Sequence, residues 1–522
     1  MDSTKDAYAF SAEGKDSDTA AVSTITGSGV YNIVGDIRAA DGGILTLDLA
    51  EGSRFEGKAV LDSGNDSQST LTMAKNSLWT LTGNSQLNSL QNEQSVIDMT
   101  GDNKAFSTLS VETLTGNGGT IIMDIDGSQV DASDKIYVTG DFSGSQTLSL
   151  KEINGLDSDP GIGQAAENTV LASVNGSGTF TADDQEGTLY WQRYELGQKD
   201  SAASGYTTDW YLKGITNLNL PTTSVEAIAA SGALAYHTWR DHDQLLQRLG
   251  DLRQHGREEE GVWVRVKGGK LSRSDQFEFE NKYTQYELGY DQKLKSTPAY
   301  TRYAGISFSY LDGDSSYSSG SGENKVKALN IYGTQIGAKG HYLDLVLKYS
   351  QLDNDFKVFD TSGNKITGDY DQNGLSISAE YGRKNNLKNN WYIEPQAQLT
   401  FGRLRGTDYT TSNGIRVDQD GIDSFVGRIG FNIGKDINEK TNIYLKANLM
   451  HEFGSGYNAS MVDASGTKAR LDRNFDDTWF EYGLGAAVQT GKNNYFYVDV
   501  ERSAGSDYKK DWQWNVGARW SF

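Results

Sequence analysis

The sequence has no cysteine, only 4 prolines, and no apolar run of the roughly 18 residues that a membrane-spanning helix requires. Without cysteine, disulfide scaffolds, thiol nucleophiles and thiolate metal sites are excluded, and the chain suits an oxidising compartment. Scarce proline beside 59 glycines suits many strands joined by tight turns. The composition therefore favours an all-β protein.

Positive charge is also in short supply, because 48 Lys and Arg stand against 70 Asp and Glu, a net charge of −22. We therefore expect no nucleic-acid partner and no attraction to anionic surfaces, and we assign the excess to solubility. The opening "MDSTKDAYAF" has neither the basic nor the apolar region of a signal peptide. We expect a secreted parent chain to carry its signal upstream, with further sequence.

Residues 260–522 alternate between apolar and polar side chains with a period of two. In residues 304–310, for example, Ala304, Ile306, Phe308 and Tyr310 are separated by small or polar residues. Period two over roughly 9–11 residues is typical of a strand that crosses a bilayer. Twelve such segments are predicted to start near residues 261, 283, 300, 325, 341, 373, 390, 421, 441, 476, 493 and 511.

The connections between these segments alternate in length, with long ones near 271–282, 312–324, 354–372, 406–420, 455–475 and 503–510. Long loops on one side and short turns on the other are typical of an outer-membrane barrel with an even number of strands. A water-soluble β-sandwich, the alternative, leaves the charged residues of the inward set unexplained: Arg265, Lys267, Asp344, Glu394, Arg428, Lys446 and Arg519.

The chain ends on "DWQWNVGARWSF", with Trp512, Trp514, Trp520 and Phe522 on one parity. In hydrocarbon every backbone polar group must be paired, so the last strand is expected to close the sheet against the first. Its aromatic face then meets lipid, and Phe522 sits at the short-turn interface.

Residues 216–259 form a linker and a predicted helix. Thr223 and Glu226 fit a capping box after Pro221, and Ser224–Gln254 as one helix would be about 46 Å long at ~1.5 Å per residue. Its polar residues exclude contact with lipid, so we expect the helix to fill a polar lumen rather than to pack on a soluble domain. The residues predicted to plug the lumen are Arg240, Asp243, Arg248, Asp251 and Arg253.

Residues 1–215 contain short strands and no helical pattern. "ILTLDL" (44–49), "STLTMA" (69–74) and "SVIDMT" (95–100) recur about every 25 residues, which favours stacked rungs of a parallel β-helix over a β-sandwich. Trp191 and Trp210 lie in later strands that are expected to cap the open end.

Several of these segments resemble the classical, or type Va, autotransporters. "LSVETLTGNGG", "SDKIYVTG" and "SGSQTLSL" within 109–150, with "TDWYLKG" (208–214), are similar to the pertactin-like autochaperone region. "LGDLRQ" (249–254), "YIEPQAQLTF" (392–401) and the terminal "ARWSF" resemble the autotransporter β-barrel. The repeats within 20–103 are closer in style to AIDA-type self-associating adhesins than to secreted proteases.

The resemblance implies an all-β fold: a right-handed parallel β-helix, a lumen α-helix and a 12-stranded transmembrane antiparallel barrel. The implied divisions are passenger rungs (1–103), an autochaperone cap (104–215), the linker and helix (216–259) and a translocator barrel (260–522). It also implies an outer-membrane location in a Gram-negative bacterium, a surface passenger, and partners in outer-membrane lipid, the barrel-assembly machinery and periplasmic chaperones. The barrel is expected to be monomeric.

Catalytic and metal-binding motifs are missing from the sequence. The five histidines form no HExxH motif, and no GxSxG segment occurs. We expect no cofactor, no metal and no enzymatic activity beyond a weak case for self-cleavage. The Asn-Asn pair of one self-cleaving subclass is missing between 215 and 260; others use lumen acids, and Glu287 and Asp291 have the required inward parity. Salt bridges to helix arginines or barrel lysines are the simpler expectation for both.

The sequence therefore predicts an outer-membrane autotransporter that delivers its own passenger, an adhesin or self-association module directed at host or neighbouring-cell surfaces. Two alternatives remain at this point. A barrel enzyme of the phospholipase or esterase type would need a Ser–His pair at the outer rim, where His451 is the candidate. A passive porin would need an open lumen.

Overall fold

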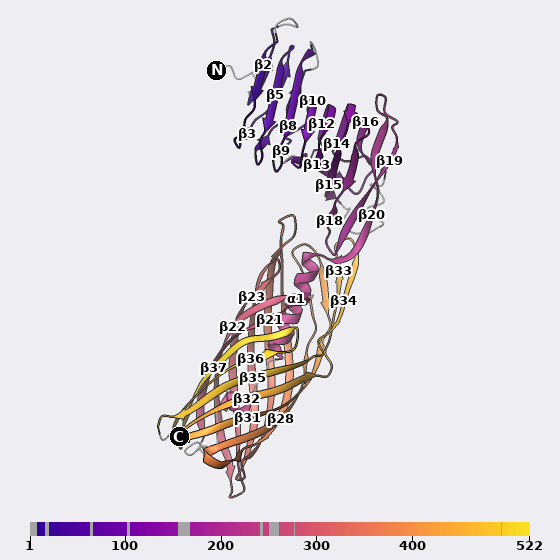
Figure 1. The fold of residues 1–522 in the computed structure, drawn as a ribbon. Coiled ribbons are helices and arrows are strands. Elements are labelled where there is room, and N and C mark those ends of the chain that lie inside the picture. The colour runs from indigo at the N-terminus through magenta and orange to yellow at the C-terminus, as the bar shows by residue number, and fades with distance from the viewer. Residues whose placement is uncertain are drawn as a thin grey trace. The chain divides into compact units, whose positions relative to one another are not determined.

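The computed structural model describes residues 8–15, 20–62, 66–101, 105–154, 168–240, 244–249, 260–275, 277–491 and 493–522. The chain divides into two compact units, and the main boundary falls between Leu220 and Pro221. The first unit consists of short stacked strands, and the second is a closed sheet with helical segments inside (Figure 1). The finer division into four segments remains a prediction.

The first unit is a parallel β-solenoid with three sheets. One sheet contains β1 (Phe10–Glu13), β4 (Ile37–Ala40) and β7 (Ala59–Leu61). The second contains β3 (Asn32–Val34), β6 (Arg54–Glu56), β9 (Leu78–Thr80), β11 (Val96–Asp98), β13 (Asn117–Asp126), β15 (Ser145–Asn154) and β17 (Thr179–Ala182). The third contains β2 (Val22–Ile25), β5 (Ile44–Leu49), β8 (Gln68–Met73), β10 (Ser85–Asn92), β12 (Thr108–Thr115), β14 (Lys135–Phe142) and β16 (Val170–Gly176).

Register keeps equivalent side chains stacked from rung to rung. Leu47 lies opposite Leu71, Leu71 opposite Leu90, Leu90 opposite Leu114, and Leu114 opposite Phe142. All five side chains are buried in one continuous apolar core. Period-two alternation sends every second residue into this core, which is why the rungs bury one face and leave the other wet.

The three repeats found in the sequence fall in two different sheets. "ILTLDL" and "STLTMA" do stack, as β5 on β8, but "SVIDMT" contains β11, which stacks on β9 in the second sheet. Each rung supplies several short strands of similar composition, so spacing alone does not separate the sheets.

Antiparallel strands cover the last rung of the solenoid. β20 (Thr208–Pro221) pairs antiparallel with β16, and β18 (Asp184–Glu186) and β19 (Tyr190–Asp200) extend the sheet beyond it. The Trp210 ring stands edge-on to Phe180 at 5.5 Å, and Phe180 stacks on Phe142 at 4.5 Å. An aromatic stack thus closes the apolar core at its last rung.

The second unit is a twelve-stranded antiparallel barrel. Its strands are β21 (Gly261–Arg273), β22 (Phe279–Ser296), β23 (Tyr300–Tyr317), β24 (Gly320–Gly337), β25 (His341–Phe359), β26 (Lys365–Arg383), β28 (Trp391–Leu404), β31 (Ile422–Asn438), β32 (Thr441–Glu452), β35 (Thr478–Gln489), β36 (Asn494–Ala504) and β37 (Tyr508–Ser521). A two-residue strand, β27 (Asn385–Asn386), and a short 3-10 turn (Lys388–Asn390) precede β28. β37 closes the sheet on β21, with Gly261 opposite Ser521.

Several strands are longer than the alternation predicted. β23 and β24 stay paired from Tyr300 to Gly337, so the expected loop near 312–324 is largely a hairpin extension. Four more strands form a small sheet at the long-loop end: β29 (Thr407–Thr410), β30 (Arg416–Gln419), β33 (Gly456–Val462) and β34 (Lys468–Asn474). Because the residues of these extensions alternate without an apolar face, the pattern of a membrane strand does not identify them.

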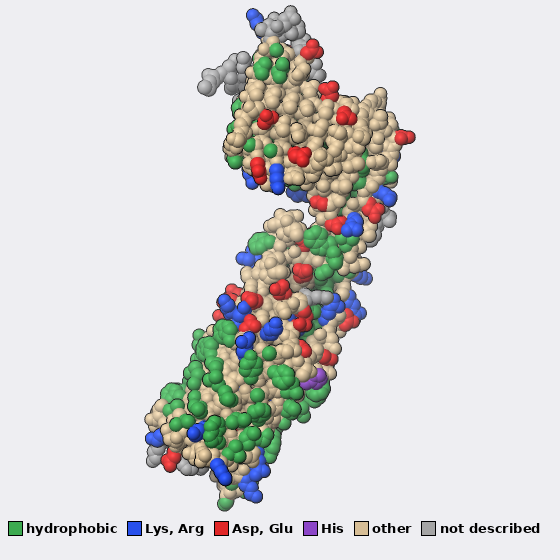
Figure 2. Space-filling model, viewed as in Figure 1, with side chains coloured by type: hydrophobic (Ala, Val, Ile, Leu, Met, Phe, Trp, Pro, Cys, Tyr) green, Lys and Arg blue, Asp and Glu red, His purple; other side chains and the backbone are tan. Residues whose placement is uncertain are grey.

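The outer wall of the barrel is apolar, as the parity predicted. Leu445, Leu484 and Ile429 are 62%, 56% and 62% exposed, values that a water-soluble protein would not maintain over a whole wall. Figure 2 shows hydrophobic side chains gathered over the lower part of the barrel, with charged side chains above them. On β37, Trp512, Trp520 and Phe522 are exposed, whereas Ala518 is only 8% exposed.

A ring of six aromatic–glycine pairs lines the short-turn half of the barrel interior. In each pair an inward aromatic ring lies directly opposite a glycine on the neighbouring strand. The pairs are Trp263–Gly289, Tyr332–Gly305, Tyr342–Gly382, Tyr392–Gly434, Tyr444–Gly485 and Tyr497–Gly517. A Cβ built on Gly305 would lie 2.2 Å from the Tyr332 ring, so the ring occupies the space of the missing side chain.

The predicted single helix from Ser224 to Gln254 is wrong, because the structure interrupts it. Helix α1 spans Thr223–Trp239, Arg240 is its C-cap, and within the described residues α2 covers Leu245–Leu249. The N-cap is Thr222 instead of Thr223, and its hydroxyl accepts from the Val225 amide at 3.4 Å. Within the described residues, neither helix combines the length and apolarity that a bilayer crossing demands.

We expect the stability of the solenoid to fall as pH rises from about 4 to about 7. Burial, which outweighs two backbone N–H bonds from Ser107 and Asp124, raises the pKa of Asp134 to about 7. In this window the folded chain keeps a proton that the unfolded chain releases, at a cost of up to roughly 1.4 kcal/mol per pH unit. Hydrogen exchange of β12–β14 amides, corrected for intrinsic rates, measures the change. Asp134→Asn should flatten it, and Asp141→Asn, on the exposed face of β14, should not.

Gly305→Val should destabilise the barrel by about 1–3 kcal/mol, because the new side chain and the Tyr332 ring cannot share one space. The urea midpoint of the folded, heat-modifiable band in detergent measures this loss. Gly333→Val is the matched control, since the nearest atom to a Cβ there is a backbone oxygen at 3.9 Å. Equal midpoints for the two variants would contradict the pairing.

Candidate functional site

The candidate site is the barrel lumen together with the helical residues it encloses, which we call the plug and define as α1, its C-cap Arg240 and α2. All but two side chains of α1 are buried, on every side of the helix. Its first part, "TSVEAIAASGALA", is dominated by small residues, which lets the walls approach closely. A helix buried all round needs contacts on every face, and the lumen supplies them.

The long-loop end of the barrel holds the start of α1. The Asn413 amide donates to the Ser224 hydroxyl at 2.9 Å, and Ser231 and Tyr370 share a hydroxyl hydrogen bond at 2.8 Å. Tyr457 of β33 lies against Gly232, where a Cβ would come within 2.4 Å of the phenol oxygen. Residues of the extended hairpins and their loops therefore contact α1 at the long-loop end of the lumen.

An aromatic collar surrounds the last turn of α1. The His237 ring stacks on Tyr508 at 4.1 Å and 11°, and Phe475 packs against both His237 and Tyr236. Arg273 of β21 lies 2.9 Å from His237 Nε2 and so donates to it. His237 therefore packs inside the lumen against aromatic rings and an arginine of the barrel.

Arg240 ties the end of α1 to the barrel wall. Its guanidinium lies 3.4 Å from Glu452 and 4.6 Å from the centre of the Trp479 ring. Glu452 also accepts from the Tyr236 hydroxyl at 2.7 Å. One buried carboxylate of β32 therefore holds both a ring and a charge of the plug, which strengthens each contact in the water-poor interior.

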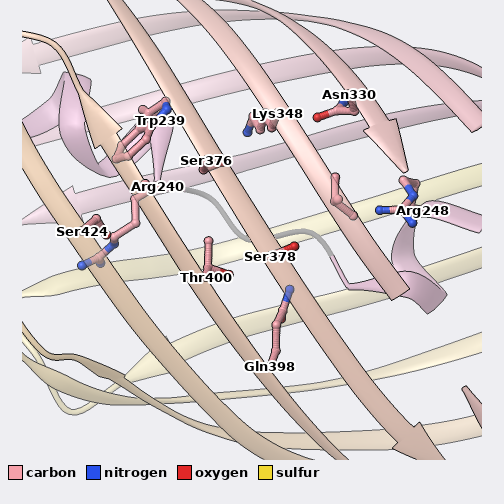
Figure 3. A pocket seen from close by; sticks show the side chains of 12 residues that line it. Trp239, Arg240, Arg248, Asn330, Lys348, Ser376, Ser378, Gln398, Thr400 and Ser424 are labelled. Atoms are coloured by element: carbon pink, nitrogen blue, oxygen red, sulfur yellow. The ribbon is translucent and has the colours of Figure 1, made fainter. Parts of the chain in front are cut away.

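The second helix is held by acidic residues from several strands. Glu380 accepts from the Leu245 amide at 2.9 Å, the first free N–H of α2. Arg248 donates to both oxygens of Asp344, at 2.9 and 2.7 Å, and its guanidinium lies 4.4 Å from the centre of the Tyr332 ring. Figure 3 shows Arg240 and Arg248 together with polar side chains of the barrel wall such as Ser378 and Gln398.

Other inward charges pair within the wall. Arg519 of β37 donates to both oxygens of Asp291, and Arg265 pairs with Glu287. Lys446 lies 2.6 Å from both Asp499 and Glu501. All seven inward charges expected from the parity are buried. Because an unpaired charge in such a site is costly, these pairs keep the wall polar and satisfied.

A small cavity lies beside the plug. It has a volume of about 40 Å³ and touches Trp239, Arg240 and Arg248, and barrel residues such as Ser376, Ser378, Gln398 and Thr400 complete its lining (Figure 3). The lining combines hydroxyl, amide and cationic groups with apolar surface. Because all but two residues of α1 are buried, the barrel wall packs closely around this helix.

The predicted site residues have different outcomes. Arg240 and Arg248 face acids of the wall, as described, whereas Asp243, Asp251 and Arg253 lie outside the described residues. Glu287 and Asp291 pair with barrel arginines, instead of the helix arginines or barrel lysines that we expected. The described residues contain no cluster of three or more His, Cys, Asp or Glu side chains able to hold a metal ion.

Sequence reasoning missed the acids that bind the plug, Glu380 and Glu452. Both have the inward parity of their strands, so the alternation marked them as lumen residues. The alternation does not identify their partners in the plug, Leu245 and Arg240, which are 135 and 212 residues away in the chain.

We expect Asp344→Asn to weaken the plug, because it leaves the Arg248 charge buried without its carboxylate partner. The expected loss is about 3 kcal/mol in thermal stability, with a rise in single-channel conductance in planar bilayers. The double variant Arg248→Met/Asp344→Leu should recover most of the stability. Arg403→Gln is the control, since the Arg403–Asp423 pair is 61% and 58% exposed and is worth less than about 1 kcal/mol. Unchanged conductance in Asp344→Asn would contradict a plugging role for this pair.

Known protein families match both units of the chain. Residues 262–501 match the family model "Autotransporter beta-domain", and residues 87–214 match the model "Pertactin". These matches fall on the barrel and on the later rungs and cap of the solenoid.

Curated relatives align over nearly the whole chain. The probable autotransporter YcgV of Escherichia coli K12 is 28% identical over 545 residues, covering 96% of this chain and 55% of the relative. The pertactin autotransporter of Bordetella bronchiseptica is 28% identical over 544 residues, covering 93% and 56%. The serine protease pet autotransporter of Escherichia coli O44:H18 is 26% identical over 469 residues, covering 87% and 34%.

The chain spans about half the length of the first two of these relatives. A solenoid that matches pertactin, a closed barrel that matches the autotransporter β-domain and a plug that joins them occur here in one chain. The protein is therefore a member of the autotransporter family, comprising a pertactin-like passenger segment and its translocator barrel.

Proposed function

We propose that this chain anchors in the outer membrane of a Gram-negative bacterium and delivers its own β-helical passenger to the cell surface. The carrying observation is the direction of the plug. Its start contacts Asn413 at the long-loop end, whereas the amide of the C-terminal Phe522 bonds Glu260, just before β21, at the short-turn end. The chain before the plug therefore leaves the lumen on the side opposite to the barrel termini.

The strand parity supports the outer-membrane location. Short turns at the end that carries both barrel termini and long hairpins at the other match the orientation of outer-membrane barrels, in which the short turns face the periplasm. Trp512, Trp514, Trp520 and Phe522 share the outward parity of the closing strand, and we infer that they form the insertion signal read by the barrel-assembly machinery. Periplasmic chaperones would protect it before insertion, and the barrel would act as a monomer.

The passenger is best assigned as an adhesin or self-association module. A column of hydroxyl side chains follows the third sheet in register, in the order Thr46, Thr70, Ser89 and Thr113. Each is only partly buried, so the column offers repeated donors and acceptors to another surface. A second copy on a neighbouring cell, or a host surface, is the proposed partner.

We further propose that this part of the protein is not an enzyme. Glu287 accepts from Arg265, from the Ser307 hydroxyl at 2.7 Å and from the Asn330 amide at 3.3 Å, an arrangement that suits a structural carboxylate. His451, the candidate of the hydrolase alternative, bonds the Thr478 hydroxyl at 2.7 Å instead of a serine. Some relatives are named serine proteases, and any such activity would belong to sequence beyond this chain.

Digestion of intact cells tests the proposal. With an N-terminal tag, externally added protease should remove the tag from whole cells and leave a barrel fragment protected in the outer membrane. Permeabilised cells are the control for protease access to the periplasm. A tag that survives on intact cells and is lost only after permeabilisation would overturn the proposed direction of delivery.

A further inference from the structure

The outer wall of the barrel carries a groove that the proposed function does not use. It has a volume of about 420 Å³ and crosses β28, β31, β32, β35 and β36. Its lining is almost entirely apolar and includes Trp391, Ile443, Leu445, Leu484, Ala486 and Val498. The sizes of the side chains that line this hollow explain it.

The cause is a short side chain among long ones. Ala486 lies directly opposite Ile443 on one side and Val498 on the other, and these neighbours are 48% and 43% exposed. Gly434 and Gly485 also line the groove, and because a side chain at either position would point into the lumen, only their backbone faces outward. The floor of the groove is backbone and a single methyl group.

One end of the groove is polar. Trp391 and Lys435 are cross-strand partners, and the Lys435 ammonium lies 5.6 Å from the centre of the Trp391 indole. The neighbouring carboxylate of Asp436 is occupied by Lys384 at 3.3 Å. Among the described residues Lys435 forms no ion pair, so its charge is available to an anion.

The groove rises from the short-turn edge into the apolar band. Trp391 is the first residue of β28, whereas Val498 is the fifth residue of β36, further from the strand ends. The same register row links them through Lys435, Ile443 and Ala486. A molecule lying along it would have its head at an indole and an ammonium and its tail against aliphatic side chains, as interfacial residues favour.

We propose that the groove is a binding site for one diacyl glycerophospholipid of the periplasmic leaflet, with an acyl chain along Ala486 and the phosphate on Lys435. The ammonium and the phosphate are complementary in charge, and the indole occupies the level of the headgroup. An apolar groove in a wall that faces lipid takes an acyl chain without displacing water, so the fit of shape and the charge at its head give the selectivity.

Native mass spectrometry tests this site. The full chain in detergent is titrated with palmitoyl-oleoyl phosphatidylglycerol, and the detergent is then removed in the mass spectrometer. The wild type should retain one lipid per chain. Ala486→Phe fills the groove and should abolish that first binding event, and Lys435→Gln should weaken it roughly fivefold. Bromination of the acyl chain should quench the Trp391 emission, measured as the difference between wild type and Trp391→Phe.

Matched controls separate this site from general lipid contact. Ala379→Phe places the same bulk on the outer face of β26, and Arg383→Gln removes a cation from the same strand at the short-turn end. Both should leave the first binding event unchanged. Equal lipid retention by Ala486→Phe and Ala379→Phe, or no retained lipid on the folded wild type, would overturn the proposal, and the heat-modifiable band confirms that each variant is folded.

Discussion

Backbone pairing in hydrocarbon is the constraint on which this structure depends. A polar N–H or C=O cannot be left open to lipid, so the sheet must end where it began, and β37 meets β21 along its whole length. Closure fixes which side chains face inward, because parity is preserved around the ring. The apolar wall, the charged lumen and the location of both barrel termini at one edge all follow from that single seam.

A polar lumen creates the next requirement, which is that every enclosed charge finds a partner. The wall satisfies part of it internally, through Arg519 with Asp291 and Lys446 with Asp499 and Glu501. Three further inward acids, Asp344, Glu380 and Glu452, are satisfied in part by groups of the plug. The plug is therefore held by specific buried contacts, and its removal would leave several carboxylates without part of their hydrogen bonding.

Sequence alone predicted the parts of the fold that are governed by periodicity. Twelve alternating segments gave the barrel, because a period of two survives any tilt or curvature. The sequence did not predict the end of α1, because contacts with distant residues determine it. "YHTWRDHDQLLQ" contains no glycine or proline that would end a helix. In the structure α1 ends where Arg240 contacts Glu452, and the Leu245 amide beyond it donates to Glu380. Solenoid sheet membership was missed for a similar reason, since neighbouring strands of one rung share their composition.

The six aromatic–glycine pairs fall on six successive strand couples: β21 with β22, β23 with β24, β25 with β26, β28 with β31, β32 with β35, and β36 with β37. Each couple is one hairpin connected at the long-loop end, and each contains its own aromatic side chain and the glycine opposite it. The barrel is thus modular, because each of its six hairpins is stabilised by its own aromatic–glycine pair. Lengthening or exchanging one hairpin leaves the aromatic–glycine pairs of the other five intact. Surface loops can therefore diversify while the barrel retains its circumference.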